Sequence, residues 1–564
     1  MNVIAATRSY VDRIVSDPNN PGMKVLLLDD ATTKTVATVY SQTQILERDI
    51  YLVERLEQTE RHEAMKHLKA AVFVRPTWAN LELLKKELAK PKFSEYHVYF
   101  SNVVPGDMLK QLADADEQEV IRQVQEFYAD YVAVNEDLFT INQRCSLRLS
   151  TDERDAARND MLERNVTAIL SALLSLKTQP SAIRYQGQSK VARQVATEVY
   201  ERMEADGVFQ FKNRNTGPLL LVLDRADDPV TPLLSQWTYQ SMIHELLGLN
   251  NNRVKVPNQE PLPGGEPAPE EVVLSCTQDP FFAEQRFANF GDLGTSVKKL
   301  LDDYQRHTKM NEKISSIEDM QNFVARYPAF RSQSLNVSKH VALISELSRL
   351  VDVCALMDVS ALEQDIACHD ERSAQWRQLL EKLTDPAIKA PDKLRLALLY
   401  VIRYEGAVNI DRLKNALDDA YLPPEKIALL DSIIAYAGKR VRGPGLFGVN
   451  KSFVSKMSKT LKTSLDGIEN VYAQHVPLLN DVLDVAAKGK LKDQQYPALT
   501  CVSAAKPTLI IVYIVGGTTY EEATKIYEIN QDPKSSYRVV LGGSYVHNST
   551  SFLDDLADAY TTYV

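Results

Sequence analysis

The sequence predicts an α/β protein with a parallel-sheet first domain, a discontinuous α/β middle domain and a mainly helical domain inserted into the middle one. Three observations lead to this prediction. Residues 1–135 alternate between short apolar runs and polar, helix-like stretches, which is typical of a parallel sheet covered on both faces. The chain from Phe281 to about Tyr472 has an almost wholly helical pattern. Strand-like runs then return near the end of the chain.

Four apolar runs of the first domain are expected to form buried strands: Lys24–Asp29, Ile50–Val53, Ala70–Val74 and His97–Phe100. The polar stretch Trp78–Ala89 has the pattern of a helix that covers such a sheet. Pro105-Gly106-Asp107 is expected to form a turn that caps a helix beginning at Met108. We place the first domain at residues 1–135.

The middle domain is expected to combine segments that lie far apart in the sequence. Two helices, Thr151–Leu176 and Ser189–Ala205, precede a strand at Leu219–Leu223. Two more strands, Leu509–Val515 and Arg538–Leu541, lie near the end. Because two strands do not form a stable sheet alone, we expect them to pair with Leu219–Leu223.

The helical domain is predicted at residues 246–479, so the middle domain comprises residues 136–245 and 480–564. Lys255–Glu271 is rich in Pro, Gly and acidic residues, and indicates an exposed loop. A helix at Thr295–Ser316 is expected to pair with the next one as a hairpin at about residues 295–360. The second helix shows one apolar stripe: Val341, Ile344, Leu347 and Val351.

Composition and charge argue against several classes of protein. The net charge of −10 argues against nucleic acid as the main partner, because phosphate binding needs a basic surface. The five cysteines are far apart and form no CxxC pair, which indicates reduced thiols in a cytosolic protein. No signal peptide is apparent, and the longest apolar runs are far shorter than the roughly 18 residues of a membrane span. We therefore expect a cytoplasmic protein that reaches membranes only through another molecule.

The motifs that suggest chemistry are weak. Gly443–Gly448 spells GxGxxG, but it follows a helix-like segment and contains a proline, whereas a dinucleotide site needs a preceding strand. Val515–Glu522 has a glycine turn suited to an anion, but Thr519 and Glu522 fit a capping box better. The histidines do not cluster as metal ligands. We predict no catalytic residue, no cofactor and no metal.

The stretch from Lys439 to Lys462 contains seven basic residues and no acidic one. A patch that binds membranes or nucleic acid is one interpretation. A solvated loop and helix face is favoured, because the chain as a whole is acidic.

The segment Leu219–Tyr239 is the most informative part of the chain. Asp224 and Arg225 stand at the carboxyl end of the expected strand, and Asp228 begins a turn. Such a cluster at a strand end suits catalysis. We favour an internal ion-pair latch that fixes the turn, because no nucleophile, metal ligand or phosphate loop lies nearby in the sequence.

This segment resembles the signature of the SM family, the Sec/Munc-type regulators of SNARE-mediated membrane fusion. The family pattern DRxxDxxxPLL with a following Trp and Tyr is matched by Asp224, Arg225, Asp228, Pro232, Leu233, Leu234, Trp237 and Tyr239. The resemblance extends over nearly the whole chain, through Thr277–Phe282 (TQDPFF), Tyr327-Pro328, Gly438–Arg442 (GKRVR), Gly467–His475 (GIENVYAQH), Val515–Glu522 and Leu541–Asn548. GKRVR and GIENVYAQH look most like the endosomal and trans-Golgi vacuolar-protein-sorting branch, of the VPS forty-five type.

The resemblance implies a three-domain arch whose central cavity grips a syntaxin-type SNARE. It also implies a groove on the first domain for the N-terminal peptide of that SNARE. By position, the groove maps to Leu109, Leu112, Ile121, Val124 and Glu126. Their spacing of three would place each apolar pair on one helix face, although packing against the domain's own sheet is an equal alternative for each residue. The cavity contacts map to Asp29, Lys34 and Glu54.

The helical hairpin resembles the family's template for aligning SNARE helices. Pro328 is expected near its bend, because proline disfavours α geometry in the preceding residue. The serine and asparagine residues of Ser332–Asn336 have a weak tendency to form helix. This is consistent with a hinge that switches between folded and extended forms. The resemblance thus implies a monomeric SM-type protein that binds a syntaxin-like SNARE and promotes SNARE complex assembly at endosomes and the trans-Golgi. A nucleotide- or sugar-phosphate-using enzyme and a lipid-binding adaptor remain alternatives.

Overall fold

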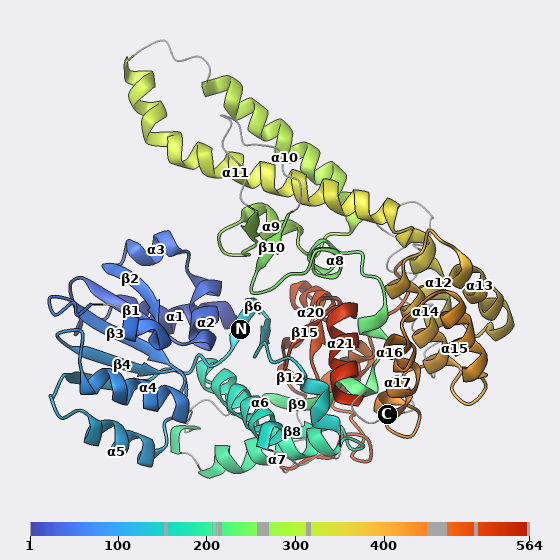
Figure 1. Ribbon diagram of the computed structural model, residues 1–564, viewed down its shortest axis with the longest axis horizontal. Helices are drawn as coiled ribbons and strands as arrows, with labels where there is room; N and C mark the ends of the chain where they lie inside the picture. Colours follow the sequence, from blue (N-terminus) through green and yellow to red (C-terminus); the bar gives the residue numbers. More distant parts are fainter. Residues whose placement is uncertain are drawn as a thin grey trace. The chain divides into compact units, whose positions relative to one another are not determined.

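The computed structural model describes residues 2–61, 63–151, 156–205, 207–209, 211, 217–256, 270–311, 317–443, 445–447, 471–500 and 506–560. For residues 60–61, 304–305, 307–311 and 317–334 it describes the backbone only. The chain forms two compact units, shown in Figure 1. The first comprises Met1–Arg225, Asp481–Thr518 and Lys525–Val546, and the second comprises Ala226–Asn480, Thr519–Thr524 and His547–Val564.

The first unit contains the expected parallel sheet, with one strand more than the sequence suggested. Its strands are β1 (Lys24–Leu28), β2 (Ile50–Arg55), β3 (Lys69–Val74), β4 (Tyr96–Phe100) and β5 (Ile121–Glu126). Their order is β2-β1-β3-β4-β5, and every pair is parallel. All five residues of β1 are buried, because helices cover both faces of the sheet.

The helices around this sheet are α1 (Val3–Val15), α2 (Asp30–Val39), α3 (Gln42–Leu46), α4 (Trp78–Ala89) and α5 (Gly106–Ala115). Helix α2 begins directly after β1, where Asp29 and Thr32 form a capping box. Alternate strand residues pack with apolar side chains of α4 and α5 in one core, which places these two helices on the same face of the sheet (Figure 1).

A six-stranded sheet completes the first unit. Its strands are β6 (Val132–Asn135), β7 (Leu138–Thr140), β8 (Ala182–Tyr185), β9 (Leu219–Asp224), β12 (Leu509–Val515) and β14 (Arg538–Gly543), in the order β6-β7-β14-β12-β9-β8. β9 pairs with β12 in parallel, with Leu219 opposite Ile510. The pairing of strands from distant parts of the sequence is thus confirmed. Helices α6 (Ala156–Ser175) and α7 (Lys190–Ala205) lie where the sequence predicts helices.

The second unit is mainly helical. It contains α8 (Tyr239–Leu246), α9 (Pro280–Gln285), α10 (Phe290–Asn311), α11 (Ile317–Val353), α12 (Leu356–Cys368), α13 (Arg372–Thr384), α14 (Ala390–Arg403), α15 (Ile410–Asp419), α16 (Pro424–Ile427), α17 (Leu429–Ala437) and α21 (Ser549–Tyr560). Two short strands, β10 (Arg253–Lys255) and β11 (Glu271–Val273), pair antiparallel at the base of the predicted loop, most of which lies outside the described residues.

Several elements are short or are shared between the units. These are α19 (Leu478–Ala487), α20 (Tyr520–Gln531), β13 (Thr518–Thr519), β15 (Val546–His547) and the 3-10 turns Leu56–Arg61, Ser146–Ser150, Gly207–Phe209, Arg225–Asp227 and Thr231–Leu233. Among the described residues, no helix is both long and apolar enough to cross a membrane.

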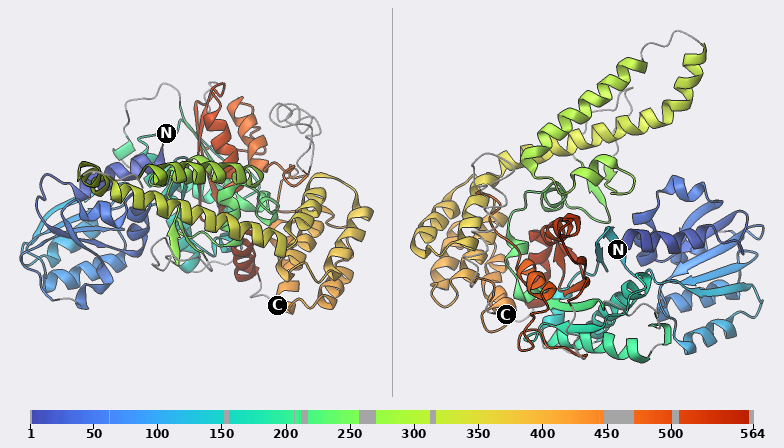
Figure 2. Two further views of the ribbon diagram at one scale, coloured as in Figure 1. Left: turned by 90° about the horizontal axis from the view of Figure 1, so that it is seen from above. Right: turned by 180° about the vertical axis from the view of Figure 1, so that it is seen from behind.

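The helical hairpin of the second unit consists of α10 and α11, which run side by side in both views of Figure 2. Residues 312–316, which connect the two helices in the sequence, lie outside the described residues. Helix α11 continues without a break from Ile317 to Val353, so Pro328 lies inside a helix. Figure 1 shows that this helix bends towards its N-terminal end, and the role of Pro328 as a hinge stays a prediction. Ser332–Asn336 is helical as well.

Candidate functional site

The signature segment is held by hydrogen bonds within each unit. In the first unit, the Asp224 carboxylate accepts a bond of 2.6 Å from the Ser189 hydroxyl. In the second, Asp228 accepts bonds from the Thr231 N–H and hydroxyl at 3.0 and 2.6 Å, and from the Leu478 N–H at 3.1 Å. Arg225 is one of the largest fully buried side chains. These contacts fix the turn after β9 and support a structural role for the segment.

The predicted peptide groove lies where α5 meets β5. Residues Leu109 and Leu112 are on α5, whereas Ile121, Val124 and Glu126 are on β5 and not on a helix. The Asp116 carboxylate accepts bonds of 2.9 Å from the N–H groups of Val120 and Ile121, and so holds the connection between the two elements.

A β-bulge explains how Ile121 and Val124 share a face although they are three residues apart in a strand. Ile121 pairs with Tyr96 and Val124 with Val98, and the register shifts between these pairs. Tyr96 and Val98 belong to the core beneath α4 and α5. Paired residues of parallel strands point to the same face, so Ile121 and Val124 face α5.

The five residues differ in their exposure. Leu109 and Val124 keep 38% and 39% of their surface exposed, whereas Leu112 keeps 2%. Leu112 packs in the core, and Ile121 is half-buried against it. The Glu126 carboxylate is half-buried and accepts a bond of 2.8 Å from the Val104 N–H. We call this region the α5–β5 surface: Leu109, Val124 and Glu126 form its outer part, and Leu112 and Ile121 form its floor. Leu112 offers little of its surface in the structure without a partner, and its role as a contact residue stays a prediction.

The predicted cavity residues also differ from one another. Asp29 is 5% exposed, and its carboxylate accepts bonds of 2.7 Å from the Arg75 N–H and the Asn80 amide. Asp29 therefore holds α2 and the end of β3, and its role as a contact residue stays a prediction. Lys34 on α2 is half-buried and pairs with Asp30 at 2.7 Å. Glu54 is half-buried on β2.

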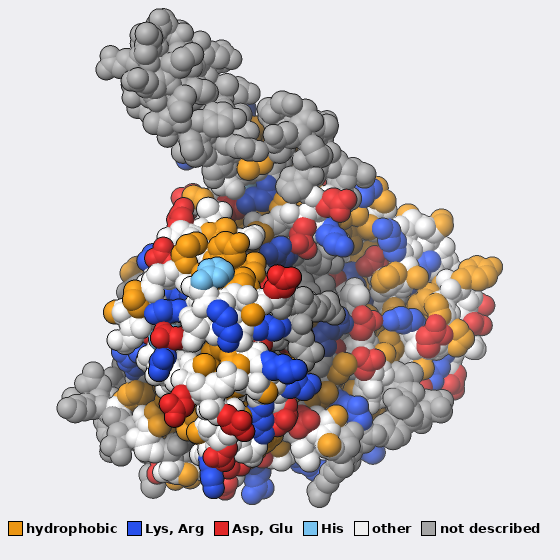
Figure 3. Space-filling view, turned by 60° about the vertical axis from the view of Figure 1, so that its left-hand side comes forward, with side chains coloured by type: hydrophobic (Ala, Val, Ile, Leu, Met, Phe, Trp, Pro, Cys, Tyr) orange, Lys and Arg blue, Asp and Glu red, His pale blue; other side chains and the backbone are white. Residues whose placement is uncertain are grey.

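The basic stretch is described only in part. Lys439 bonds through its N–H to the Glu405 carboxylate at 2.8 Å, and Arg442 is buried against the carbonyls of Ala437 and Ile402. Lys451, Lys456, Lys459 and Lys462 lie outside the described residues. On the face that Figure 3 shows, the described basic side chains lie among acidic ones.

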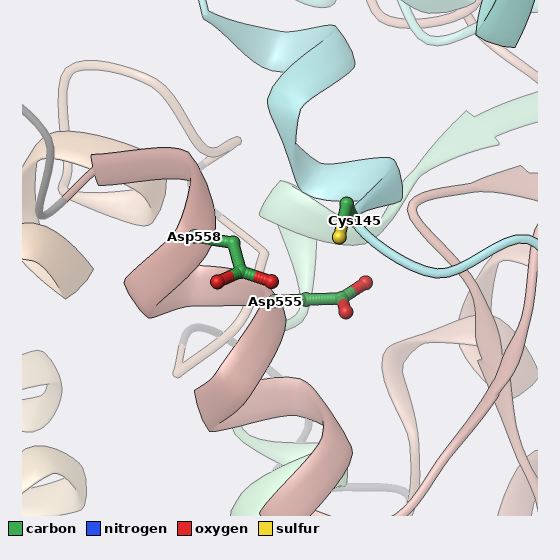
Figure 4. A group of neighbouring side chains, drawn as sticks. All are labelled: Cys145, Asp555 and Asp558. Carbon is green, nitrogen blue, oxygen red and sulfur yellow. The ribbon is translucent and has the colours of Figure 1, made fainter.

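The weak motifs give no reaction site among the described residues. Gly443 donates its N–H to Asp227 at 2.6 Å, and two positions of its GxGxxG motif are not described. Thr519 and Glu522 form the expected capping box, with bonds of 2.9 and 3.3 Å. Figure 4 shows Asp555 and Asp558 on α21; Cys145, also labelled, belongs to the first unit. Two carboxylates of one helix are not by themselves a metal site.

The fold and the signature segment define the class of protein. The Sec1 family model matches residues 24–555, and the chain belongs to this family. It is similar to vacuolar protein sorting-associated protein 45 of Dictyostelium discoideum, with 42% identity covering 99% of this chain and 97% of that protein. The protein of the same name from Mus musculus is 42% identical, covering 99% and 96%.

Solved structures agree with this assignment. The structure of the SM protein Vps45 in complex with the Qa SNARE Tlg2 matches with a TM-score of 0.89 and 40% identity, covering 99% of this chain and 98% of that one. The Unc18–syntaxin 1 complex from Monosiga brevicollis matches with a TM-score of 0.80 at 20% identity, a likeness of fold alone. The resemblance and the fold class inferred from the sequence are thus confirmed.

Proposed function

We propose that this protein is an SM-type SNARE-binding protein, which binds a syntaxin-like SNARE and promotes SNARE complex assembly in vesicle fusion at endosomes and the trans-Golgi. One observation carries the proposal: the full-length likeness, at 40% identity, to an SM protein solved in complex with a Qa SNARE. The protein acts as a monomer on the cytoplasmic side and reaches membranes through the SNARE. The domain limits are those predicted above: residues 1–135, residues 136–245 with 480–564, and residues 246–479.

The α5–β5 surface takes the N-terminal peptide of the SNARE in this proposal. Exposed apolar side chains beside a half-buried carboxylate suit a short peptide with apolar anchors and a hydrogen-bond donor. Leu109 and Val124 offer the apolar contact, and Glu126 offers the acceptor. Lys34 and Glu54 remain proposed contacts for the SNARE core.

The hairpin α10–α11 aligns SNARE helices. In this proposal the protein catalyses no covalent step. It lowers the barrier to association by holding two partners in register. Binding energy from the N-terminal peptide keeps the SNARE close while its helices pair.

The test is a calorimetric titration of the syntaxin N-terminal peptide into the wild type and into the variants Leu109→Arg and Val124→Arg. Both changes place a charge on an apolar contact, and we expect each to weaken binding by about 10-fold or more. Leu46→Arg is the matched control, because Leu46 is also exposed in the first unit but lies on α3. Unchanged affinity in both groove variants would show that the peptide binds elsewhere.

A further inference from the structure

The root of the hairpin contains a buried polar chain. His340 of α11 is fully buried, and its Nδ1 lies 2.8 Å from the Tyr239 hydroxyl on α8. Its Nε2 lies 2.9 and 3.1 Å from the two carboxylate oxygens of Asp279, the residue before α9. Lys339 of α11 also pairs with the Asp279 carboxylate. All four residues belong to the second unit.

The chemistry of these groups fixes the direction of each hydrogen bond. Burial lowers the pKa of His340, although the Asp279 carboxylate acts in the other direction. The ring is therefore neutral near pH 7. A carboxylate only accepts, so Nε2 carries the proton and donates to Asp279. Nδ1 then accepts from the Tyr239 hydroxyl, whose proton is retained because burial raises the pKa of Tyr239.

Asp279 connects the chain to two further elements. Its carboxylate caps α9 by accepting a bond of 3.0 Å from the Phe282 N–H. Lys339, which pairs with it, also donates to the Val273 carbonyl of β11 at 3.2 Å. The Phe281 ring packs on the His340 ring with centroids 4.6 Å apart. The groups around His340 and Lys339 thus come from α8, β11, α9 and α11.

Among the described side chains of α11, from Leu335 to Val353, the other buried ones are apolar: Val337, Leu343, Leu347 and Val351. Apolar contacts are non-directional and tolerate a helix that slides or rotates by small steps. Hydrogen bonds lose strength steeply with distance and angle. Since each residue of a helix rises 1.5 Å and turns by about 100°, a shift of one residue would break both bonds of His340.

We propose that the chain Tyr239–His340–Asp279, with Lys339, is the clamp that fixes the axial and rotational position of α11 in the second unit. These residues position the hairpin for SNARE assembly. This consequence rests on the function proposed above, whereas the clamp itself rests only on the contacts.

The test compares Tyr239→Phe and Asp279→Asn with Tyr404→Phe. Tyr404→Phe is the matched control, because it also removes a hydrogen bond from a buried tyrosine, made to Gln375 at 2.6 Å within the α13–α14 helices. Hydrogen exchange of the α11 segment from Leu335 to Val353 is the first readout. We expect it to be about 10-fold faster in both clamp variants, because the loss of one buried hydrogen bond shifts a local opening equilibrium by roughly that factor. Tyr404→Phe should leave this segment unchanged.

The second readout is the rate of SNARE complex assembly, measured together with the affinity for the syntaxin N-terminal peptide. The clamp variants should slow assembly and leave peptide affinity unchanged, since the peptide site is in the first unit. Unchanged exchange in both variants, or equal effects in Tyr404→Phe, would overturn the clamp. If the wild-type protein does not accelerate SNARE complex assembly, the proposed function is contradicted. The hydrogen-exchange data would still test the clamp in that case.

Discussion

The α5–β5 surface of the first unit and the hairpin root of the second are built in opposite ways. The first keeps apolar side chains exposed on the edge of a rigid parallel sheet, over a floor of core residues. The second buries polar side chains that bond in defined directions across a long helix. In our proposals, a partner covers the first surface, whereas the polar groups of the second are bonded within the chain and hold a helix in place.

The largest expected effect separates the floor of the α5–β5 surface from its outer part. Leu112→Ala should lower the free energy of unfolding by about 2–5 kcal/mol, because it leaves a cavity in a packed core. Leu109→Ala, on the same helix, should change it by less than about 0.5 kcal/mol, since Leu109 is exposed. Urea denaturation measures both. Equal losses of unfolding free energy in the two variants would show that Leu112 and Leu109 do not differ as floor and outer part of the surface.

A second prediction concerns acid and applies to the hairpin root alone. The titratable groups that face His340 are Tyr239, Asp279 and Lys339. Burial alone would raise the pKa of Asp279, but the bonds from His340 and Lys339 outweigh this and lower it from 3.8 to about 2. The pKa of His340 is also below its ordinary 6.5. Both groups bind protons more weakly in the folded state than in the unfolded one.

Stability from these two groups is therefore fully present above about pH 6.5 and is lost as the pH falls through the folded pKa values. The Asp279 shift corresponds to roughly 2 kcal/mol, lost between about pH 4 and pH 2. We expect protection of the α11 root from hydrogen exchange, corrected for the intrinsic rate, to fall in the wild type as the pH drops below about 6.5, the ordinary pKa of histidine. His340→Gln should flatten this dependence, and His369→Gln, a change at an exposed histidine of the second unit, should not. The same slope in both variants would contradict the prediction.

The smallest expected effect concerns Lys34. Its pair with Asp30 is partly exposed and joins positions four residues apart on a helix, so Lys34→Ala should change the free energy of unfolding by less than about 0.5 kcal/mol. A loss of SNARE affinity in this variant would therefore report a direct contact. Thermal unfolding together with a binding titration separates the two effects, and unchanged affinity would remove Lys34 from the proposed contacts.

The features that the sequence predicted correctly depend on strong local patterns. The runs Leu219–Leu223 and Leu509–Val515 are continuous and apolar, as strands buried on both faces require, so their pairing was foreseen across half of the chain. The signature around Asp224 gave the family because many positions had to match together. Each of these patterns lies within one short segment of the chain and can therefore be recognised in the sequence.

The features that were missed depend on tertiary contacts. Strand β5 has the polar sequence IRQVQE, and only its pairing with β4 and its bulge reveal it as a strand. The stripe of α11 was expected at Val341 and Ile344, but these are half-buried, and the buried row runs through Val337, His340 and Leu343. His340 lies three residues from Val337 and three from Leu343, and this spacing was the sequence signal for a buried histidine in α11. Pro328 lies within the continuous helix α11, because helix propensity yields to the surrounding fold.

The six-stranded sheet has a consequence for biosynthesis. Its inner strand β12 pairs with β9 on one side and with β14 on the other. Strands β12 and β14 are translated only after residue 508. The five-stranded sheet is complete by Glu126 and can form early, while β8 and β9 must wait for most of the chain with an apolar edge unpaired. A stop codon anywhere in the helical region would therefore release a product that combines one finished sheet with one half-built, aggregation-prone sheet, and we expect quality control to remove it.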